Sequence, residues 1–306
     1  MLVRNPRPHA DNEAAAMVVH NAPVEDHCYV IRPTDWLLIA FAALTALATL
    51  SLYVLATMTE QTFAWTVDPP LSAAFLGGGY AAGFLLVVLS RRRRVWAYAR
   101  IGYLTVLVFT VITLAATILH IDRFHFGSPQ VSAQAAAWIW LVVYIVVPVG
   151  MVVVLPLQMR APGTHPARGR PIDLWLRVAL TVQGLVMFTA GVGLFFFPAA
   201  RTVWPWELTP LTARTIAAWL IALAVAAALA LAENDLDRLD VPAATYATLG
   251  LTQIAAVVRF AEQIDWQRPS AWIYVAMVVS VLAVGLAGLL RIRQASGRRH
   301  RSTTIG

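Results

Sequence analysis

The sequence predicts an all-α membrane protein with eight transmembrane helices, built as two tandem four-helix repeats of the same orientation. Three observations support this fold class: an apolar composition, an internal repeat and eight long apolar runs. Hydrophobic residues make up 59% of the 306 residues, charged residues make up only 13%, and the mean hydropathy is +0.68. Soluble domains carry about 25% charged residues, so this chain is predicted to lie in lipid.

The repeat is visible as a fixed offset of 140 positions. Pro70-Leu71-Ser72-Ala73 opens one apolar run, and Pro210-Leu211-Thr212-Ala213 opens another. The same offset relates further residues along both copies: Thr105 with Thr245, Thr113 with Gln253, Ala115-Ala116 with Ala255-Ala256, Asp122 with Glu262, His125 with Asp265, Phe126 with Trp266 and Pro129 with Pro269. An offset shared without gaps over this length is hard to obtain from composition alone, and it predicts a duplicated unit.

Each of the eight apolar runs is long enough to cross a bilayer as a helix. About 20 helical residues rise ~30 Å, which is the thickness of the hydrocarbon core, and helices are required because lipid offers no partner for bare backbone amides. The runs are Trp36–Thr57, Leu71–Ser90, Ile101–Leu119, Ala135–Leu157, Leu174–Phe197, Thr212–Ala232, Pro242–Phe260 and Ala271–Leu290.

The arginines predict the orientation in a bacterial cytoplasmic (inner) membrane. All 23 basic residues are arginine, and 18 of them fall on the side of the two termini, which leaves 5 on the other side. Cytoplasmic connections carry the excess of basic residues, so both termini are predicted to be cytoplasmic. The expected segments are a polar tail (1–34), the first repeat (35–160), a linker (161–172), the second repeat (173–290) and a basic tail (291–306).

Several function classes find no support in the sequence. The net charge of +7 does not indicate nucleic acid, because the arginines cluster at the ends of apolar runs and no binding motif is present. His120 and His125 diverge by about 140° on a helix, so we expect no metal, and no motif indicates a cofactor. Phosphate-binding, serine-hydrolase, zinc-protease and Cys-x-x-Cys motifs are absent as well. An enzyme that uses His120 or His125 remains an open alternative.

The extracytoplasmic end is predicted to hold the functional residues, because acids and aromatic residues recur there in both copies. We expect them to line a shared polar site between the repeats. The alternative is an aromatic belt with interfacial ion pairs, which the headgroup level favours in any membrane protein. The candidate residues are Arg259, Glu262, Asp122, His125, His120, Gln253, Thr113, Asp265, Arg214 and Glu207.

Arg259 and Glu262 are the main polar contacts of this hypothesis. They lie three positions apart, a spacing that allows an ion pair on a helix. A row of threonines at helical spacing, Thr245, Thr248 and Thr252, leads up to Arg259 and can line a polar path. The alternative for the threonines is that they bond carbonyls of their own helix and serve packing.

The segment from Trp204 to Arg214 reads W-P-W-E-L-T-P-L-T-A-R. It resembles a string found in uncharacterised multi-pass membrane proteins of bacteria, and this resemblance implies no activity. We therefore expect a protein that binds or passes a small solute or lipid-like molecule; the alternative is a non-catalytic membrane scaffold or assembly factor. The expected partners are membrane lipids and such a ligand. A homo-oligomer or a membrane partner protein stays open.

Overall fold

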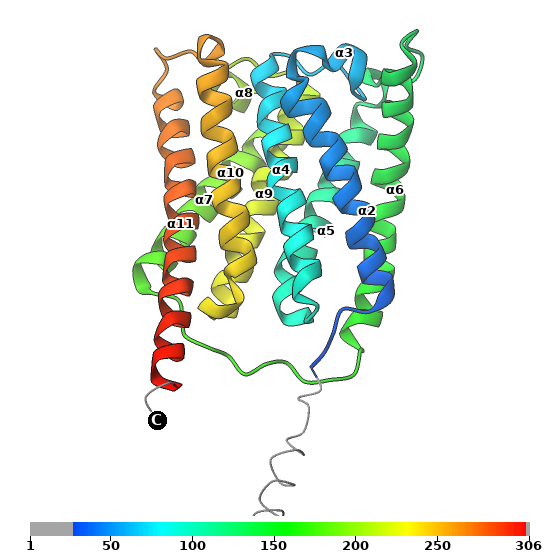
Figure 1. The fold of residues 1–306 in the computed structure, drawn as a ribbon. Coiled ribbons are helices and arrows are strands. Elements are labelled where there is room, and N and C mark those ends of the chain that lie inside the picture. Colours follow the sequence, from blue (N-terminus) through cyan, green and yellow to red (C-terminus); the bar gives the residue numbers. More distant parts are fainter. Residues whose placement is uncertain (1–26, 304–306) are drawn as a thin grey trace, which may run out of the picture.

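The computed structural model describes residues 27–303, and within this range eight helices are long and apolar enough to cross a membrane (Figure 1). This confirms the predicted all-α membrane class with eight spans. The first span joins α2 (Arg32–Thr49) to a π-helical turn, η1 (Leu50–Val54). The others are α4 (Pro70–Arg93), α5 (Trp96–Leu119), α6 (Val131–Met159), α7 (Leu174–Phe196), α9 (Pro210–Glu233), α10 (Asp240–Arg259) and α11 (Pro269–Thr303).

The two ends of the bundle differ in character. At one end lie the linker between α6 and α7, the α4–α5 and α9–α10 turns with η4 (Leu236–Arg238), and both ends of the described chain (Figure 1). We call this the arginine-rich end. The opposite, tryptophan-rich end carries the short elements η2 (Ala56–Met58), α3 (Thr59–Thr62), η3 (Ile121–Arg123), α8 (Ala200–Val203) and η5 (Ala261–Gln263). Most of the predicted polar tail, residues 1–26, lies outside the described residues.

Several element boundaries coincide at the offset of 140 residues. α4 and α9 both begin at a proline, at Pro70 and Pro210, and both have 24 residues. Each ends at a residue in the left-handed conformation, Arg94 with φ 55° and Asn234 with φ 45°. The 3-10 turns η3 and η5 also differ by 140 positions. These coincidences agree with the predicted duplication, which itself stays a prediction.

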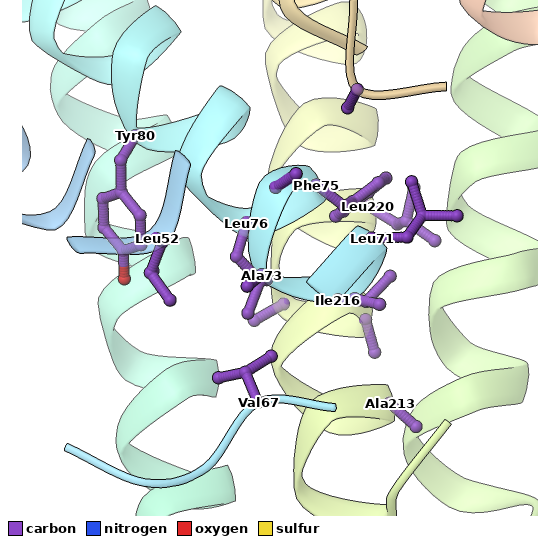
Figure 2. Packing of buried hydrophobic residues seen from close by; sticks show 14 of the residues in the cluster. Leu52, Val67, Leu71, Ala73, Phe75, Leu76, Tyr80, Ala213, Ile216 and Leu220 are labelled. Carbon is purple, nitrogen blue, oxygen red and sulfur yellow. The ribbon is translucent and has the colours of Figure 1, made fainter. Parts of the chain in front are cut away.

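Helices from the two halves of the chain alternate in the bundle. α4 packs against α2 of its own half and against α10 of the other half, while α9 packs in the same manner against α7 and α5. Small residues permit the close approach: a Cβ on Gly77 of α4 would lie 2.5 Å from the backbone nitrogen of Tyr53. Figure 2 shows the resulting core, in which Leu71 and Phe75 of α4 meet Ile216 and Leu220 of α9.

Candidate functional site

His125 fastens two loops of the first half together at the tryptophan-rich end. Its ring Nδ1 lies 3.0 Å from the Phe63 carbonyl oxygen, and its Nε2 lies 3.1 Å from the Thr66 hydroxyl. Its backbone amide donates to the Ala64 carbonyl at 2.9 Å. The loop that carries buried Trp65 is therefore held against the loop that follows α5. All the polar atoms of His125 are used within the protein.

Asp265 occupies the corresponding position in the second half and makes a comparable loop contact. Its backbone amide donates to the Pro205 carbonyl at 2.9 Å, and its carboxylate pairs with Arg268 at 2.7 Å. Arg268 in turn donates to the Thr202 and Trp204 carbonyls. The two predicted site residues thus anchor equivalent loops, and this contact accounts for their polar groups without a ligand.

Arg259 caps the end of the first span. Its two terminal nitrogens donate to the carbonyls of Tyr53 at 2.6 Å and Val54 at 3.2 Å. These carbonyls close η1, where the end of a helix carries partial negative charge that a cation neutralises. Within the described residues Arg259 forms no ion pair with Glu262, because α10 ends at Arg259 and Glu262 falls in η5. The expected helical i,i+3 pair is therefore not formed.

Arg214 performs the equivalent task for the first span of the second half. Its Nε donates to the Phe195 carbonyl at 3.1 Å, at the end of α7. Its guanidinium also donates to Nε2 of His120, which follows α5. Burial, followed by the positive charge of Arg214, lowers the pKa of His120 below its ordinary value of about 6.5. His120 is therefore held neutral as an acceptor for an arginine from the other half.

The three remaining acids do not converge on a common site. Asp122 pairs with its neighbour Arg123 at 3.1 Å, and both side chains are exposed. Glu207 and Glu262 are exposed too, and neither forms an ion pair within residues 27–294. In that same part of the chain no group of three His, Cys, Asp or Glu side chains is placed to hold a metal ion. The charges of this end therefore resemble interfacial contacts more than the walls of a vestibule.

Gln253 and the threonines take part in helix packing. Gln253 is buried; its Nε2 donates to the Phe75 carbonyl at 2.9 Å and its Oε1 accepts from the Tyr274 hydroxyl at 3.1 Å. Thr113, its counterpart at the offset, is buried and its hydroxyl has no hydrogen-bond partner. The other threonine hydroxyls donate to carbonyls three or four residues earlier, as seen at Thr110, Thr117, Thr245, Thr248 and Thr252. This pattern fits the packing alternative.

Two apolar cavities lie among the spans, and sequence reasoning did not identify them. The α7–α11 cavity has a volume of about 380 Å³ and is walled by α4, α7, α9, α10 and α11, with Met187, Trp219, Gln253, Tyr274 and Met277 among its lining residues. The α2–α6 cavity has a volume of about 310 Å³ and is walled by α2, α4, α5, α6 and α9, with Phe41, Tyr80, Phe109, Trp140, Tyr144 and Trp219 among its lining residues.

Each cavity opens sideways between the first and the fourth span of its half. Val186 of α7 and Ile273 of α11 line the α7–α11 cavity and are also exposed on the outside of the bundle. Leu47 of α2 and Ile139 of α6 do the same for the α2–α6 cavity. Because these residues belong to membrane-spanning helices, the openings face the hydrocarbon region. Both cavities are therefore accessible from lipid.

The polar groups in the two walls differ in how well they are satisfied. In the α2–α6 cavity the hydroxyls of Tyr80 and Tyr144 bond each other at 2.6 Å. In the α7–α11 cavity the indole N–H groups of Trp204 and Trp219 are buried and have no acceptor. Buried Trp N–H groups usually find a partner. The α7–α11 cavity therefore has two spare donors within its wall.

The arginine-rich end holds a buried ion network that sequence reasoning also missed. Arg238 in η4 is 4% exposed and pairs with Glu233 at 3.0 Å and with Asp235 at 2.9 Å. It also donates to the Pro166 carbonyl of the linker, and Arg100 of α5 pairs with Glu233. This network joins the linker to both halves. Its sequence signal was opposite charge at offset-related positions, because residue 93 is arginine where residue 233 is glutamate.

Comparison of the chain with protein-family models, with curated proteins and with solved structures finds no match.

Proposed function

We propose that the protein binds an apolar, lipid-like molecule in the α7–α11 cavity, which the molecule enters from the bilayer. The observation that carries this proposal is a cavity of about 380 Å³ that opens between α7 and α11 within the membrane-spanning region. Small-molecule sites are concave, mostly apolar and about 300–1,000 Å³ in volume. The cavity has this size and character.

The chemistry of the wall indicates the ligand class. Aliphatic and aromatic side chains such as Val186, Met187 and Met277 make up most of the surface, and they offer dispersion contacts to a hydrocarbon chain or ring. The unpartnered indole N–H groups of Trp204 and Trp219 suit a ligand that carries one or two oxygen acceptors. An ionic ligand is not favoured, because the lining residues include no charged side chain.

This proposal keeps the lipid-like ligand expected from the sequence and moves its site. The expected polar path relied on Arg259 and Glu262, but Arg259 caps the first span and Glu262 is exposed. Two further proposals accompany it. The arginine-rich end faces the cytoplasm of a bacterial inner membrane, in accord with the arginine distribution, and the two halves arose by duplication, in accord with the shared element boundaries.

Photolabelling tests the binding proposal. The probe is a long-chain alcohol with a diazirine on its hydrocarbon tail, added to the purified protein in lipid nanodiscs, with unlabelled alcohol as competitor. We expect saturable labelling of peptides from α7, α9 and α11. Ala190→Phe, which fills part of the α7–α11 cavity, should remove most of this competable labelling. Ala48→Phe is the matched control, because Ala48 lines the α2–α6 cavity.

Two outcomes would contradict the proposal. One is labelling that no competitor reduces, which is what ordinary lipid contact at the outer surface produces. The other is competable labelling that Ala190→Phe leaves unchanged while the variant retains the unfolding profile of the wild type. Either result would favour the alternative of a non-catalytic scaffold, whose helices need only pack.

A further inference from the structure

We infer that Trp219 is the partition that separates two ligand compartments in this protein and limits how long a chain each one accepts. This inference rests on the proposed function. Trp219 of α9 lines the α7–α11 cavity, the α2–α6 cavity and a third, smaller space of about 110 Å³ between them. It therefore stands where the three spaces meet.

The walls of the three spaces are continuous on either side of Trp219. Leu223 and Leu249 line both the α7–α11 cavity and the third space. Gly83 and Leu86 line both the α2–α6 cavity and the third space. Each large cavity thus borders the third space through shared side chains. The indole of Trp219 is the group that all three have in common.

The indole fills room that a glycine leaves free. Trp219 and Gly79 are related by the offset of 140 residues, and they face each other across the boundary between the two halves. A Cβ on Gly79 would lie 2.9 Å from Cε2 of Trp219, and one on Gly83 would lie 3.7 Å from its Cη2. One copy of the repeated position therefore supplies the bulk, and the other supplies the space for it.

Aromatic rings hold the indole in this place. The Phe109 ring lies 4.2 Å from the Trp219 ring, centroid to centroid, and the Tyr80 ring lies 5.3 Å away at an interplanar angle of 89°. Phe109 and Tyr80 belong to the wall of the α2–α6 cavity. Because the Trp219 N–H has no acceptor, a smaller residue here removes packing without leaving a hydrogen-bond partner unsatisfied. A smaller residue should therefore join the cavities.

Compartment coupling tests this inference with the diazirine alcohol in the full-length protein. In the wild type, Ala48→Phe should leave labelling from the α7–α11 cavity unchanged, because the partition keeps the compartments independent. In Trp219→Ala, the same Ala48→Phe change should weaken that labelling severalfold. Longer unlabelled alcohols, which compete poorly in the wild type, should compete well in Trp219→Ala. Trp204→Ala is the matched control: it also removes an indole, but Trp204 lines only the α7–α11 cavity among the three spaces.

Equal competition profiles in the wild type and Trp219→Ala, or no effect of Ala48→Phe in either background, would overturn the inference while the binding proposal stands. No competable labelling in the wild type would instead defeat the proposed function itself. Should Trp219→Ala fail to fold, native mass spectrometry of the wild type decides the matter. We then expect two bound short-chain alcohols, of which Ala190→Phe and Ala48→Phe each remove one; a single alcohol that both variants displace would contradict separate compartments.

Discussion

Arg93 at the end of α4 forms an ion pair with Asp240 at the start of α10, across the boundary between the two halves of the chain. Arg100 of α5 forms the corresponding pair with Glu233 of α9. Positions 93 and 233, and positions 100 and 240, are related by the offset of 140 residues. The same contact is therefore made twice with the charges exchanged, so each half supplies the charge that the other lacks.

Glu233 should be among the most sensitive positions for stability. Its carboxylate pairs with both Arg100 and Arg238, and it is 10% exposed. Removal of one partner from a buried ion pair leaves an uncompensated charge and costs about 3–5 kcal/mol. Glu233→Gln should therefore lower the free energy of unfolding by about 3 kcal/mol, as measured by titration with sodium dodecyl sulfate.

The matched control for Glu233 is Asp35, which pairs with Arg91 at the same end of the bundle. Those side chains are 40% and 50% exposed, and exposed pairs contribute about 0–1 kcal/mol. Asp35→Asn should therefore change stability by less than about 1 kcal/mol. Equal losses in the two variants would show that burial of the Glu233 network does not matter.

Arg259 should matter for the stability of the first span and not for ligand binding. Arg259→Leu removes two hydrogen bonds to the Tyr53 and Val54 carbonyls. Because the arginine is exposed, we expect a loss of about 1 kcal/mol in the free energy of unfolding. Competable photolabelling of the α7–α11 cavity should persist. Arg123→Leu, at an exposed ion pair, serves as the control with a smaller effect. Loss of labelling in folded Arg259→Leu would revive the polar path.

His120 should make stability depend on pH in the mildly acidic range. Burial and Arg214 lower its pKa in the folded state, so the unfolded chain binds a proton more readily. Its stabilising contribution is present in full above the unfolded pKa of about 6.5 and is lost as the pH falls below that value. The wild type should therefore lose stability on acidification below about pH 6.5, and His120→Gln should show a shallower loss. Parallel pH profiles for the two proteins would contradict this account.

The two ends of the bundle should differ in their access from outside the cell. Cysteines are placed in a Cys28→Ser background at Gly127, where an added Cβ meets open space, and at exposed Ala167 in the linker. A membrane-impermeant maleimide should label Gly127→Cys on intact cells. It should label Ala167→Cys only after lysis. The reverse pattern would show that the arginine-rich end faces outward.

Hydropathy alone was sufficient to predict the spans. A stretch of about 20 apolar residues has few alternatives to a membrane helix, and all eight predicted runs overlap a span in the structure. The boundaries moved where local signals compete. The first span begins at Arg32 and not at Trp36, because Pro33 suits the first turn of a helix.

The candidate site was harder to predict, because its contacts depend on distant parts of the chain. Arg259 bonds carbonyls of Tyr53 and Val54, more than 200 positions away, and periodicity carries no information about such partners. The proximity of Glu262 in sequence suggested a pair that the end of α10 prevents. Cavities are harder still, because they depend on how side chains from several helices fill space. The exchanged charges at positions 93 and 233 were visible in the sequence and could have indicated the network.

Mass spectrometry of the material that co-purifies with the protein tests the central claim most directly. Wild type, Ala190→Phe and Ala48→Phe are purified identically, and the molecules they retain are extracted into organic solvent and quantified. The account predicts an apolar, lipid-like compound that the wild type and Ala48→Phe retain at similar levels for the α7–α11 compartment and that Ala190→Phe loses. Retention of the same compounds in the same amounts by a folded Ala190→Phe would contradict it.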